Sequence, residues 1–401
     1  MTIAHRAARV FDGHDLREGI DVLTDGPTIV AVARRGDTPP DVEVLDHGRD
    51  STLLPGLVDA HTHLVFSCIP DVPAGVPHDA DGLDRLIRHN ARRALAGGVT
   101  TVRDLGDSGY AVLAVRDETA DDPSYPRILG AGPPLTTVGG HCAFLDGAAV
   151  TGSLGDAVAE RLDRGVDVVK IMSSGGNVTA NSTPPWLSQF VLAELREVVD
   201  AVHARGIPIA AHAHGSTAIR DAVAAGVDSI EHCTFMTADG TEAPDEVIAA
   251  IAESGVVASL TFSTAPGAAT PPPALLARLP GIVDAIRRLC RSGATWVASS
   301  DAGIAPTKPH DVLSYGAAFA GWVGLDSIDS LRASTSRPAA LLGLEGVVGI
   351  IAPGADADLL VVRGDPVAEP ASLVDVLGVW RRGHRAAGPS KRPDPVRPPG
   401  I

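Results

Sequence analysis

Two histidines, His61 and His63, close an apolar stretch with β character that runs over residues 55–60. Side chains alternate between the two faces of an extended strand, so residues two apart point to the same side. The two imidazoles could therefore bind one metal ion from the end of this strand. A His-x-His sequence alone is about as often a chance pair as a ligand pair, so the interpretation depends on the rest of the chain.

Four more residues able to bind a metal follow predicted strands further along: Lys170, His212, His232 and Asp301. A lone histidine after a strand is more often an ordinary polar residue than a ligand. The carboxyl ends of barrel strands converge at one mouth, however, where side chains distant in sequence become neighbours. The placement of all six residues at strand ends therefore favours a single metal centre.

The elements that would position these residues alternate between apolar β-rich runs and helical patterns. Strands are predicted at residues 55–63, 98–104, 127–130, 166–172, 207–212, 227–232, 256–261 and 295–301. Helices closed by glycine are predicted at residues 81–97, 186–206, 216–226, 245–255 and 273–293, where glycine can adopt the left-handed conformation that ends a helix. Eight such units over residues 55–345 predict an α/β fold, a (β/α)8 TIM barrel.

Short β-rich runs with turn residues between them flank this region at both chain ends. They cover residues 8–11, 19–23, 28–32 and 42–45, then 350–362 and 374–380. We expect residues 1–54 and 346–385 to combine into one small β-sandwich domain. The tail, residues 386–401, is rich in proline and charge without periodicity, and we expect it to be disordered.

Composition restricts the possible partners of this 401-residue chain. The formal net charge of −16 argues against nucleic acids and anionic membranes, which require basic patches. The four cysteines lack the spacing of a thiolate zinc site, and neither a signal-peptide core nor a membrane-spanning apolar run is evident. We expect a cytoplasmic enzyme with a small-molecule substrate, no nucleic-acid or membrane partner, and a homo-oligomeric assembly.

Several motifs make the chain resemble the amidohydrolase superfamily over nearly its whole length. These motifs are residues 55–63, 98–104, 230–232, 300–303 and 353–359. Within the superfamily, residues 167–176 together with 211–215 look most like the prolidase-like branch that is related to imidazolonepropionase.

The resemblance implies a binuclear centre of two divalent metal ions, expected to be zinc, bridged by a carboxylated Lys170. The other ligands would be His61, His63, His212, His232 and Asp301. Burial lowers the pKa of a lysine, which yields the neutral amine that can add carbon dioxide and become an anionic bridge. The alternative is an ordinary salt-bridging Lys170 beside a mononuclear site.

Three further histidines and one cysteine need an interpretation. His212 and His214 could each end the fifth strand; we choose His212 as the ligand by resemblance to this branch and assign His214 to substrate binding. His141 lies on the loop after the third strand, and the resemblance suggests that it touches the substrate. His203 is expected on a helix surface, and Cys233 in the core by strand alternation.

The resemblance and the ligand set predict hydrolysis of an amide or peptide-like bond, in a dipeptide or an N-acyl amino acid. The ions would polarise the carbonyl and generate hydroxide from a bridging water, with Asp301 as general base and acid and His141 assisting. The same centre could instead cleave a lactone, carbamate or phosphotriester. A mononuclear deaminase is disfavoured because no carboxylate follows His212 before Asp221, and a non-catalytic binding barrel because the ligand set is complete.

Overall fold

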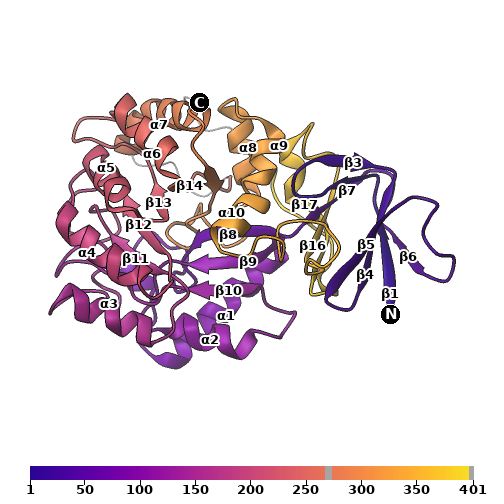
Figure 1. Cartoon of the computed structure of the whole chain (residues 1–401), viewed down its shortest axis with the longest axis horizontal. Helices are drawn as coiled ribbons and strands as arrows, with labels where there is room; N and C mark the ends of the chain where they lie inside the picture. Colours follow the sequence, from indigo (N-terminus) through magenta and orange to yellow (C-terminus); the bar gives the residue numbers. More distant parts are fainter. Residues whose placement is uncertain (267–272, 397–401) are drawn as a thin grey trace.

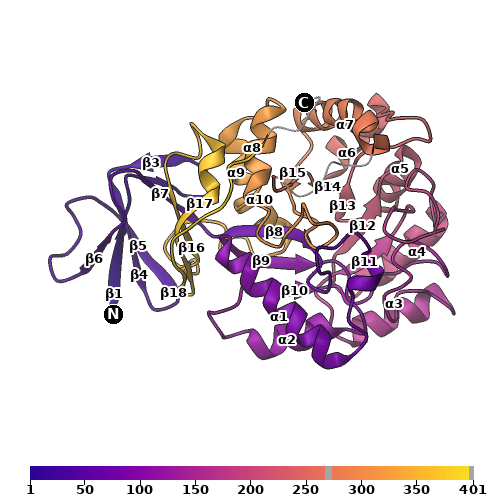
Figure 2. The ribbon, with the colours of Figure 1, turned by 180° about the vertical axis from the view of Figure 1, so that it is seen from behind.

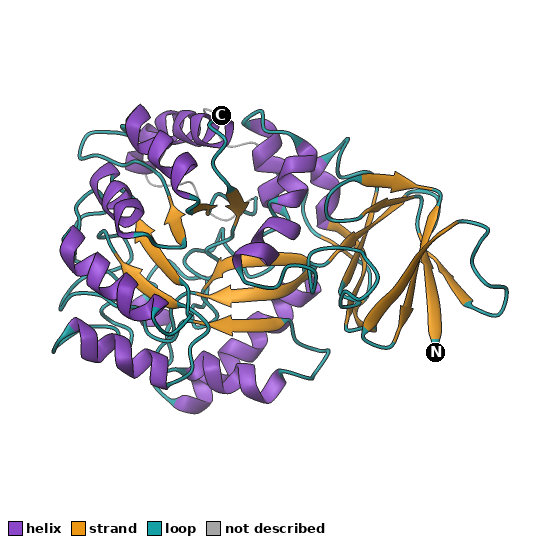
Figure 3. Cartoon of the chain, viewed as in Figure 1, coloured by secondary structure: helices purple, strands orange, loops and turns teal. Residues whose placement is uncertain are grey.

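The computed structural model describes residues 1–266 and 273–396 of the chain. Figure 1 shows an α/β region with helices around its strands, and beside it a β region that contains the N-terminus. The same two regions appear from behind in Figure 2, and Figure 3 separates them by secondary structure. No helix in the described ranges combines the length and the apolar composition that crossing a membrane demands.

Eight parallel strands form the inner part of the α/β region, each within or beside a predicted strand. They are β8 (Leu57–Thr62), β9 (Val99–Asp104), β10 (Arg127–Gly130), β11 (Val169–Met172), β12 (Ile209–Ala213), β13 (Ser229–His232), β14 (Val257–Leu260) and β15 (Trp296–Ala298). They pair as two sheets, β10-β9-β8 and β11-β12-β13-β14-β15. Single parallel bridges, Leu135 with Ile171 and Thr62 with Ala302, join the margins of these sheets. The eight strands are confirmed, whereas closure into one continuous barrel stays a prediction.

Helices cover these strands on the outside (Figure 3). They are α1 (Ala80–Ala96), α2 (Ala111–Thr119), α3 (Leu154–Asp163), α4 (Leu192–His203), α5 (Ser216–Ala225), α6 (Asp245–Ser254), α7 (Pro273–Arg291), α8 (Tyr315–Trp322), α9 (Ser327–Arg332) and α10 (Ser336–Leu341). The left-handed glycine predicted after a helix is present at Gly226 and Gly255, with φ of 85° and 79°. The helix predicted from residue 186 begins only at Leu192, because Glu194 caps the chain there by accepting a hydrogen bond from the Val191 N–H.

The β region combines strands from both chain ends. One sheet has the order β5-β4-β1-β6, and the other has the order β18-β17-β16-β7-β2-β3, with β19 paired to β17. The bounds are β1 (Thr2–Arg6), β2 (Arg9–Phe11), β3 (Leu16–Glu18), β4 (Ile20–Asp25), β5 (Thr28–Arg34), β6 (Glu43–Asp46), β7 (Ser51–Pro55), β16 (Leu359–Arg363), β17 (Asp375–Arg381), β18 (His384–Ala387) and β19 (Ser390–Lys391). Ile29 of one sheet packs in one apolar cluster with Leu53 and Trp380 of the other. The two termini therefore share a core, while the domain boundaries proposed above stay a prediction.

The prediction of a disordered tail is wrong for residues 386–396. β19 forms an antiparallel pair with β17, and the Tyr315 hydroxyl donates a hydrogen bond of 3.0 Å to the carbonyl of Pro393. The Arg392 guanidinium donates to the Leu373 carbonyl at 3.3 Å. The edge of β17 offers unpaired backbone groups, and these order a segment too polar to order itself. Residues 397–401 lie outside the described residues.

Candidate metal centre

Five of the six candidate ligands lie at or directly after the carboxyl ends of the parallel strands, and Lys170 is the second residue of its strand. His61, Lys170, His212 and His232 belong to β8, β11, β12 and β13, while His63 and Asp301 follow β8 and β15 directly. Each is buried, and together they line one cavity of about 320 Å³. The predicted convergence of six sequence-distant side chains is therefore present in the fold.

The first group of potential ligands consists of His61, His63 and Asp301. The two histidine Nε2 atoms are 3.3 Å apart, and Asp301 Oδ1 lies 3.5 Å from each of them. Two ligands of a tetrahedral zinc ion, each about 2.1 Å from the metal, are separated by roughly 3.4 Å. The spacing of these three atoms thus fits one divalent ion.

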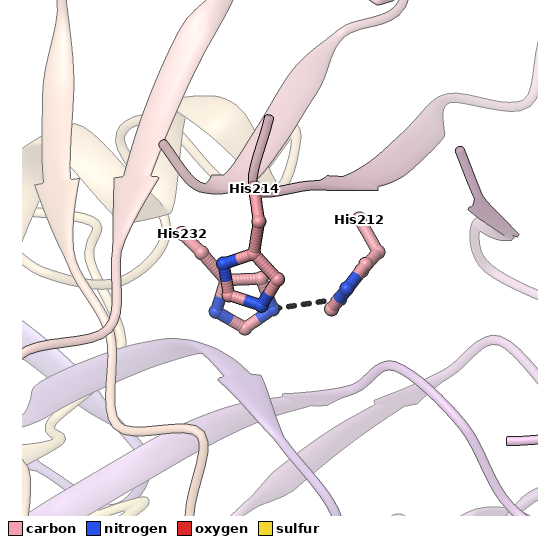
Figure 4. A group of neighbouring side chains, drawn as sticks. All are labelled: His212, His214 and His232. Carbon is pink, nitrogen blue, oxygen red and sulfur yellow. Dashed lines mark hydrogen bonds between the residues drawn. The ribbon is translucent and has the colours of Figure 1, made fainter. Parts of the chain in front are cut away.

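The second group consists of His212, His214 and His232 (Figure 4). His212 Nδ1 and His232 Nε2 face each other at 2.9 Å. The carbonyl of Gly175, 3.0 Å from His212 Nε2, can only accept a hydrogen bond, so that nitrogen carries the hydrogen and Nδ1 presents its lone pair to His232. His232 Nε2 must then donate a proton or share a cation with His212.

The ring nitrogens that point away from the centre all have oxygen partners. His61 Nδ1 lies 2.8 Å from Glu231 Oε2, His63 Nδ1 3.2 Å from the Gly106 carbonyl, and His232 Nδ1 2.8 Å from Thr261 Oγ1. Histidine ligands of metal ions characteristically place their second nitrogen against such an oxygen, which sets the tautomer and the ring orientation. The surroundings of these rings are thus compatible with metal ligation.

Lys170 is buried in the same cavity, and its Nζ has no hydrogen-bond partner among the described residues. Burial lowers the pKa of this amine to about 8, against the raising effect of Glu231. An unpartnered buried amine with a lowered pKa is compatible with the carboxylated form.

His232 and Asp301 share an unusual backbone conformation, with φ of 78° and 52°. Left-handed φ is rare for residues with a side chain and costs on the order of 1–3 kcal/mol at each position. The Asp301 N–H donates to the His61 carbonyl at 2.7 Å and so helps to hold this geometry. Two of the six candidate ligands therefore occupy strained positions, as functional side chains often do.

Sequence reasoning named Glu231 only as part of a motif and missed its role. This carboxylate is fully buried, accepts from Ser229 at 2.7 Å, and pairs with the Arg103 guanidinium at 3.2 Å. Burial opposes its ionisation, but His61 and Arg103 hold its pKa well below the usual range. Glu231 is thus a permanent anion behind a candidate ligand. Its place directly before His232, on the opposite face of the strand, was the available signal.

The other predicted residues have clear places in the structure. His141 lines the cavity, with its ring centroid 4.5 Å from that of His212, and burial lowers its pKa to about 3. His214 lies beside His212, so the structure brings both competing histidines to the site. The surface position of His203 is confirmed by its exposed ion pair with Asp228, and the core position of Cys233 by its complete burial.

Comparisons with known proteins agree with the geometry of the site. Residues 52–386 match the Amidohydrolase family. A solved Xaa-Pro dipeptidase with methionine in its active site is similar with a TM-score of 0.82 and 27% identity, over 96% of this chain and 99% of that chain. The ochratoxinase of Aspergillus niger is 26% identical over 95% of this chain and 85% of its own length. Imidazolonepropionase from Ralstonia nicotianae is 27% identical over 92% and 91% of the two chains.

Proposed function

This chain belongs to the amidohydrolase family, in its prolidase-like branch, and is a hydrolase acting on carbon–nitrogen bonds. From this premise we propose that it cleaves an amide or peptide-like bond with the help of bound metal. The proposed substrate is a dipeptide or an N-acyl amino acid. The observation that carries the proposal is the orientation of the histidine rings. His61, His63 and His232 turn one nitrogen to an outer oxygen and the other toward the shared cavity.

We propose that two divalent ions, zinc in the first instance, occupy this cavity. His61, His63 and Asp301 would hold one ion, His212 and His232 the other, and a carboxylated Lys170 would bridge them. When bound, such ions polarise the substrate carbonyl and lower the pKa of a water molecule toward neutrality. Six ligands oversupply a single tetrahedral ion, which takes four, and this favours two ions over one.

The chain's own residues then have two tasks, proton transfer and substrate binding. Asp301 is a carboxylate at neutral pH: burial alone raises its pKa, but a hydrogen bond from His63 and the charges of His61 and Lys308 hold it below the usual range. It can take a proton from the attacking water and return it to the leaving amine. We assign His141 and His214 to the substrate, since both line the cavity and contact the ring of His212.

The alternatives differ in substrate rather than in site. A lactone, carbamate or phosphotriester presents an electrophile that the same centre could attack. A mononuclear deaminase or a non-catalytic binding protein would leave the unpartnered Lys170 amine without a function.

We also propose that the eight strands form one closed (β/α)8 barrel over residues 55–345, and that residues 1–54 and 346–385 form a second domain. The proposed location is the cytoplasm, and the proposed assembly is a homo-oligomer.

Metal analysis combined with a substrate panel tests the proposed function. The purified protein is assayed on dipeptides, N-acyl amino acids, lactones and phosphotriesters, before and after removal of metal by a chelator. We expect about two ions per chain and amide hydrolysis that disappears with the metal and returns when zinc is added. Hydrolysis that survives complete metal removal, or activity confined to phosphotriesters, would contradict the proposal.

A further inference from the structure

Apart from the candidate ligands, much of the cavity lining is apolar. Helix α7 contributes Leu276, Leu279, Ile282 and Ile286, which recur every three or four residues and so form one helix face. Met236 and Phe262 line the cavity beside them. Hydrocarbon thus lines the cavity along three turns of one helix.

This apolar wall is packed firmly enough to select by shape. The rings of Phe262 and Phe319 stack with centroids 4.8 Å apart and planes at 19°. Ile282 and Ile286 belong to the main hydrophobic core, and Leu279 packs against the cluster that contains Phe319. A wall held by core packing cannot rearrange at low cost to solvate a charged group.

No arginine lines this cavity among residues 1–266 and 273–396. Lys308 does line it, but its ammonium donates to the carbonyls of Thr261 and Ser300 at 2.8 and 2.6 Å. Arg278 of α7 lies outside the cavity lining, donates to the Ala238 carbonyl at 2.7 Å and lies over the Trp186 ring. A free carboxylate placed against these apolar side chains would therefore meet hydrocarbon in place of a guanidinium clamp.

We propose that the substrate carries a bulky, uncharged apolar group, an aromatic ring or a branched chain, on one side of the scissile bond. This group packs against the apolar wall of the cavity, which includes Leu276, Leu279, Ile282, Phe262 and Phe319. The proposal rests on the proposed amide hydrolysis and narrows it. Of the two proposed substrate classes, an N-acyl amino acid with an aromatic acyl group fits the apolar wall better than a dipeptide that would place a charged terminus against it. Water adds to the carbonyl carbon, the carbon–nitrogen bond breaks, and an acid and an amine leave.

The size of the cavity agrees with such a group. A cavity of about 150 Å³ in another protein accepts benzene, and this one measures about 320 Å³. One ring and the bond to be cleaved can therefore fit together. Small-molecule sites are typically apolar with a few polar groups that set orientation, which is the arrangement found here.

Two substrate series test the proposal on the metal-loaded full-length protein. The first varies the acyl group of an N-acyl amino acid from acetyl to benzoyl to 4-carboxybenzoyl, and the second varies the amine side of an acetamide in the same way. In at least one series we expect kcat/KM to rise about tenfold or more from methyl to phenyl and to fall again when the ring carries the carboxylate. A preference for the carboxylated ring in both series would overturn the proposal.

A charged residue introduced into the apolar wall tests the proposal, and the same substitution at an exposed position is the matched control. Leu276→Arg should lower kcat/KM for the phenyl substrate at least tenfold and favour the carboxylated one, whereas Val44→Arg, at an exposed apolar position of the β region, should match the wild type. Leu276→Ala, a milder change, covers the case in which the arginine variant fails to fold. Unchanged selectivity in the folded variants would overturn the proposal.

Direct binding of indole separates this inference from the proposed reaction. Indole is an uncharged ring without a carboxylate that a metal could bind, so calorimetry reports on the wall alone. We expect indole to bind the wild type and Val44→Arg equally, and Leu276→Arg at least tenfold more weakly. If no amide is cleaved but this pattern holds, the proposed function fails and the apolar subsite stands; if amides are cleaved and indole binds all three alike, the subsite assignment fails.

Discussion

Glu231 Oε2 lies 2.8 Å from Nδ1 of His61, with both side chains buried, and the other carboxylate oxygen pairs with Arg103 at 3.2 Å. The carboxylate thereby directs the Nε2 lone pair of His61 into the cavity. A buried arginine on one side and a candidate metal ligand on the other depend on the same anion. We therefore expect Glu231 to couple the stability of the fold to the affinity of the candidate metal centre.

Replacing Glu231 by glutamine tests this coupling. We expect metal affinity to fall about 10- to 100-fold, since an outer partner of a histidine ligand is lost. Arg103 would keep its charge without the buried Glu231 anion, which costs on the order of 3–5 kcal/mol in unfolding free energy. Metal titration and chemical denaturation measure the two effects. Glu246→Gln, at an exposed position of α6, is the matched control, and wild-type metal affinity in Glu231→Gln would refute the role assigned to Glu231.

The variant Lys170→Ala should lose metal and activity, because the proposed bridging anion is removed. Short carboxylic acids supplied in the buffer should restore part of both by occupying the vacated bridging position. Elemental analysis and turnover are measured with and without the acid. Lys391→Ala, at an exposed lysine of β19, serves as the control. If Lys170→Ala retains two ions unaided, this lysine is no bridge.

The substitution Asp301→Asn retains the size of the side chain and one oxygen but removes the proton acceptor. We expect kcat to fall by at least about 10²- to 10⁴-fold, the usual worth of general acid–base assistance. Asp284→Asn on the exposed side of α7 should behave as the wild type. Steady-state kinetics and metal content are measured together. Full turnover in Asp301→Asn would move the proton transfer to another group, with His141 and His214 as the first candidates.

Removal of the His141 side chain should impair substrate binding or turnover but not metal binding. We expect His141→Ala to raise KM or lower kcat while metal content stays at the wild-type value, since His141 lies outside both ligand groups. His89→Ala, at an exposed position of α1, controls for the loss of an imidazole. Loss of metal from His141→Ala would instead make His141 a ligand.

The stability of the β region should decrease in mild acid. His5 Nδ1 and His47 Nε2 lie 3.2 Å apart, and burial lowers the pKa of His5 to about 3 and that of His47 to about 4. Both rings are therefore neutral in the fold, while the unfolded chain binds protons below its ordinary histidine pKa of about 6.5. The free energy of unfolding falls as the pH drops from about 6.5 to about 4, by at most about 1.4 kcal/mol per pH unit and histidine.

Urea denaturation between pH 4 and pH 7 measures this effect. The double variant His5→Gln with His47→Gln should show a shallower dependence on pH over the same window, because these positions then bind no protons in either state. A variant at the exposed His384 should keep the wild-type slope. Equal slopes in the double variant and the wild type would assign the acid sensitivity to the other buried histidines.

The eight parallel strands could be predicted from the sequence because their signals are local. Each is a short apolar run, and several are preceded by a helical pattern that ends in glycine, so residues within about twenty positions carry the information. The ligand positions follow from the same signals: His61, His232 and Asp301 end such runs, and strand ends converge whatever the details of packing. The helix expected from residue 186 was placed too early, because a side-chain cap at Val191 decides where α4 begins.

Contacts between distant residues were decided only by the tertiary structure. Nothing near Glu231 in the sequence indicates that its carboxylate meets His61, 170 positions away, or that Arg103 meets it from another strand. The tail is ordered by the edge of β17, and the apolar wall exists because α7 brings its side chains to the same cavity as the candidate ligands. The sequence by itself determined which side chains could do chemistry and on which strands. The fold decided their partners and their cavity, because hydrogen bonds and packing act over a few ångströms in space regardless of separation along the chain.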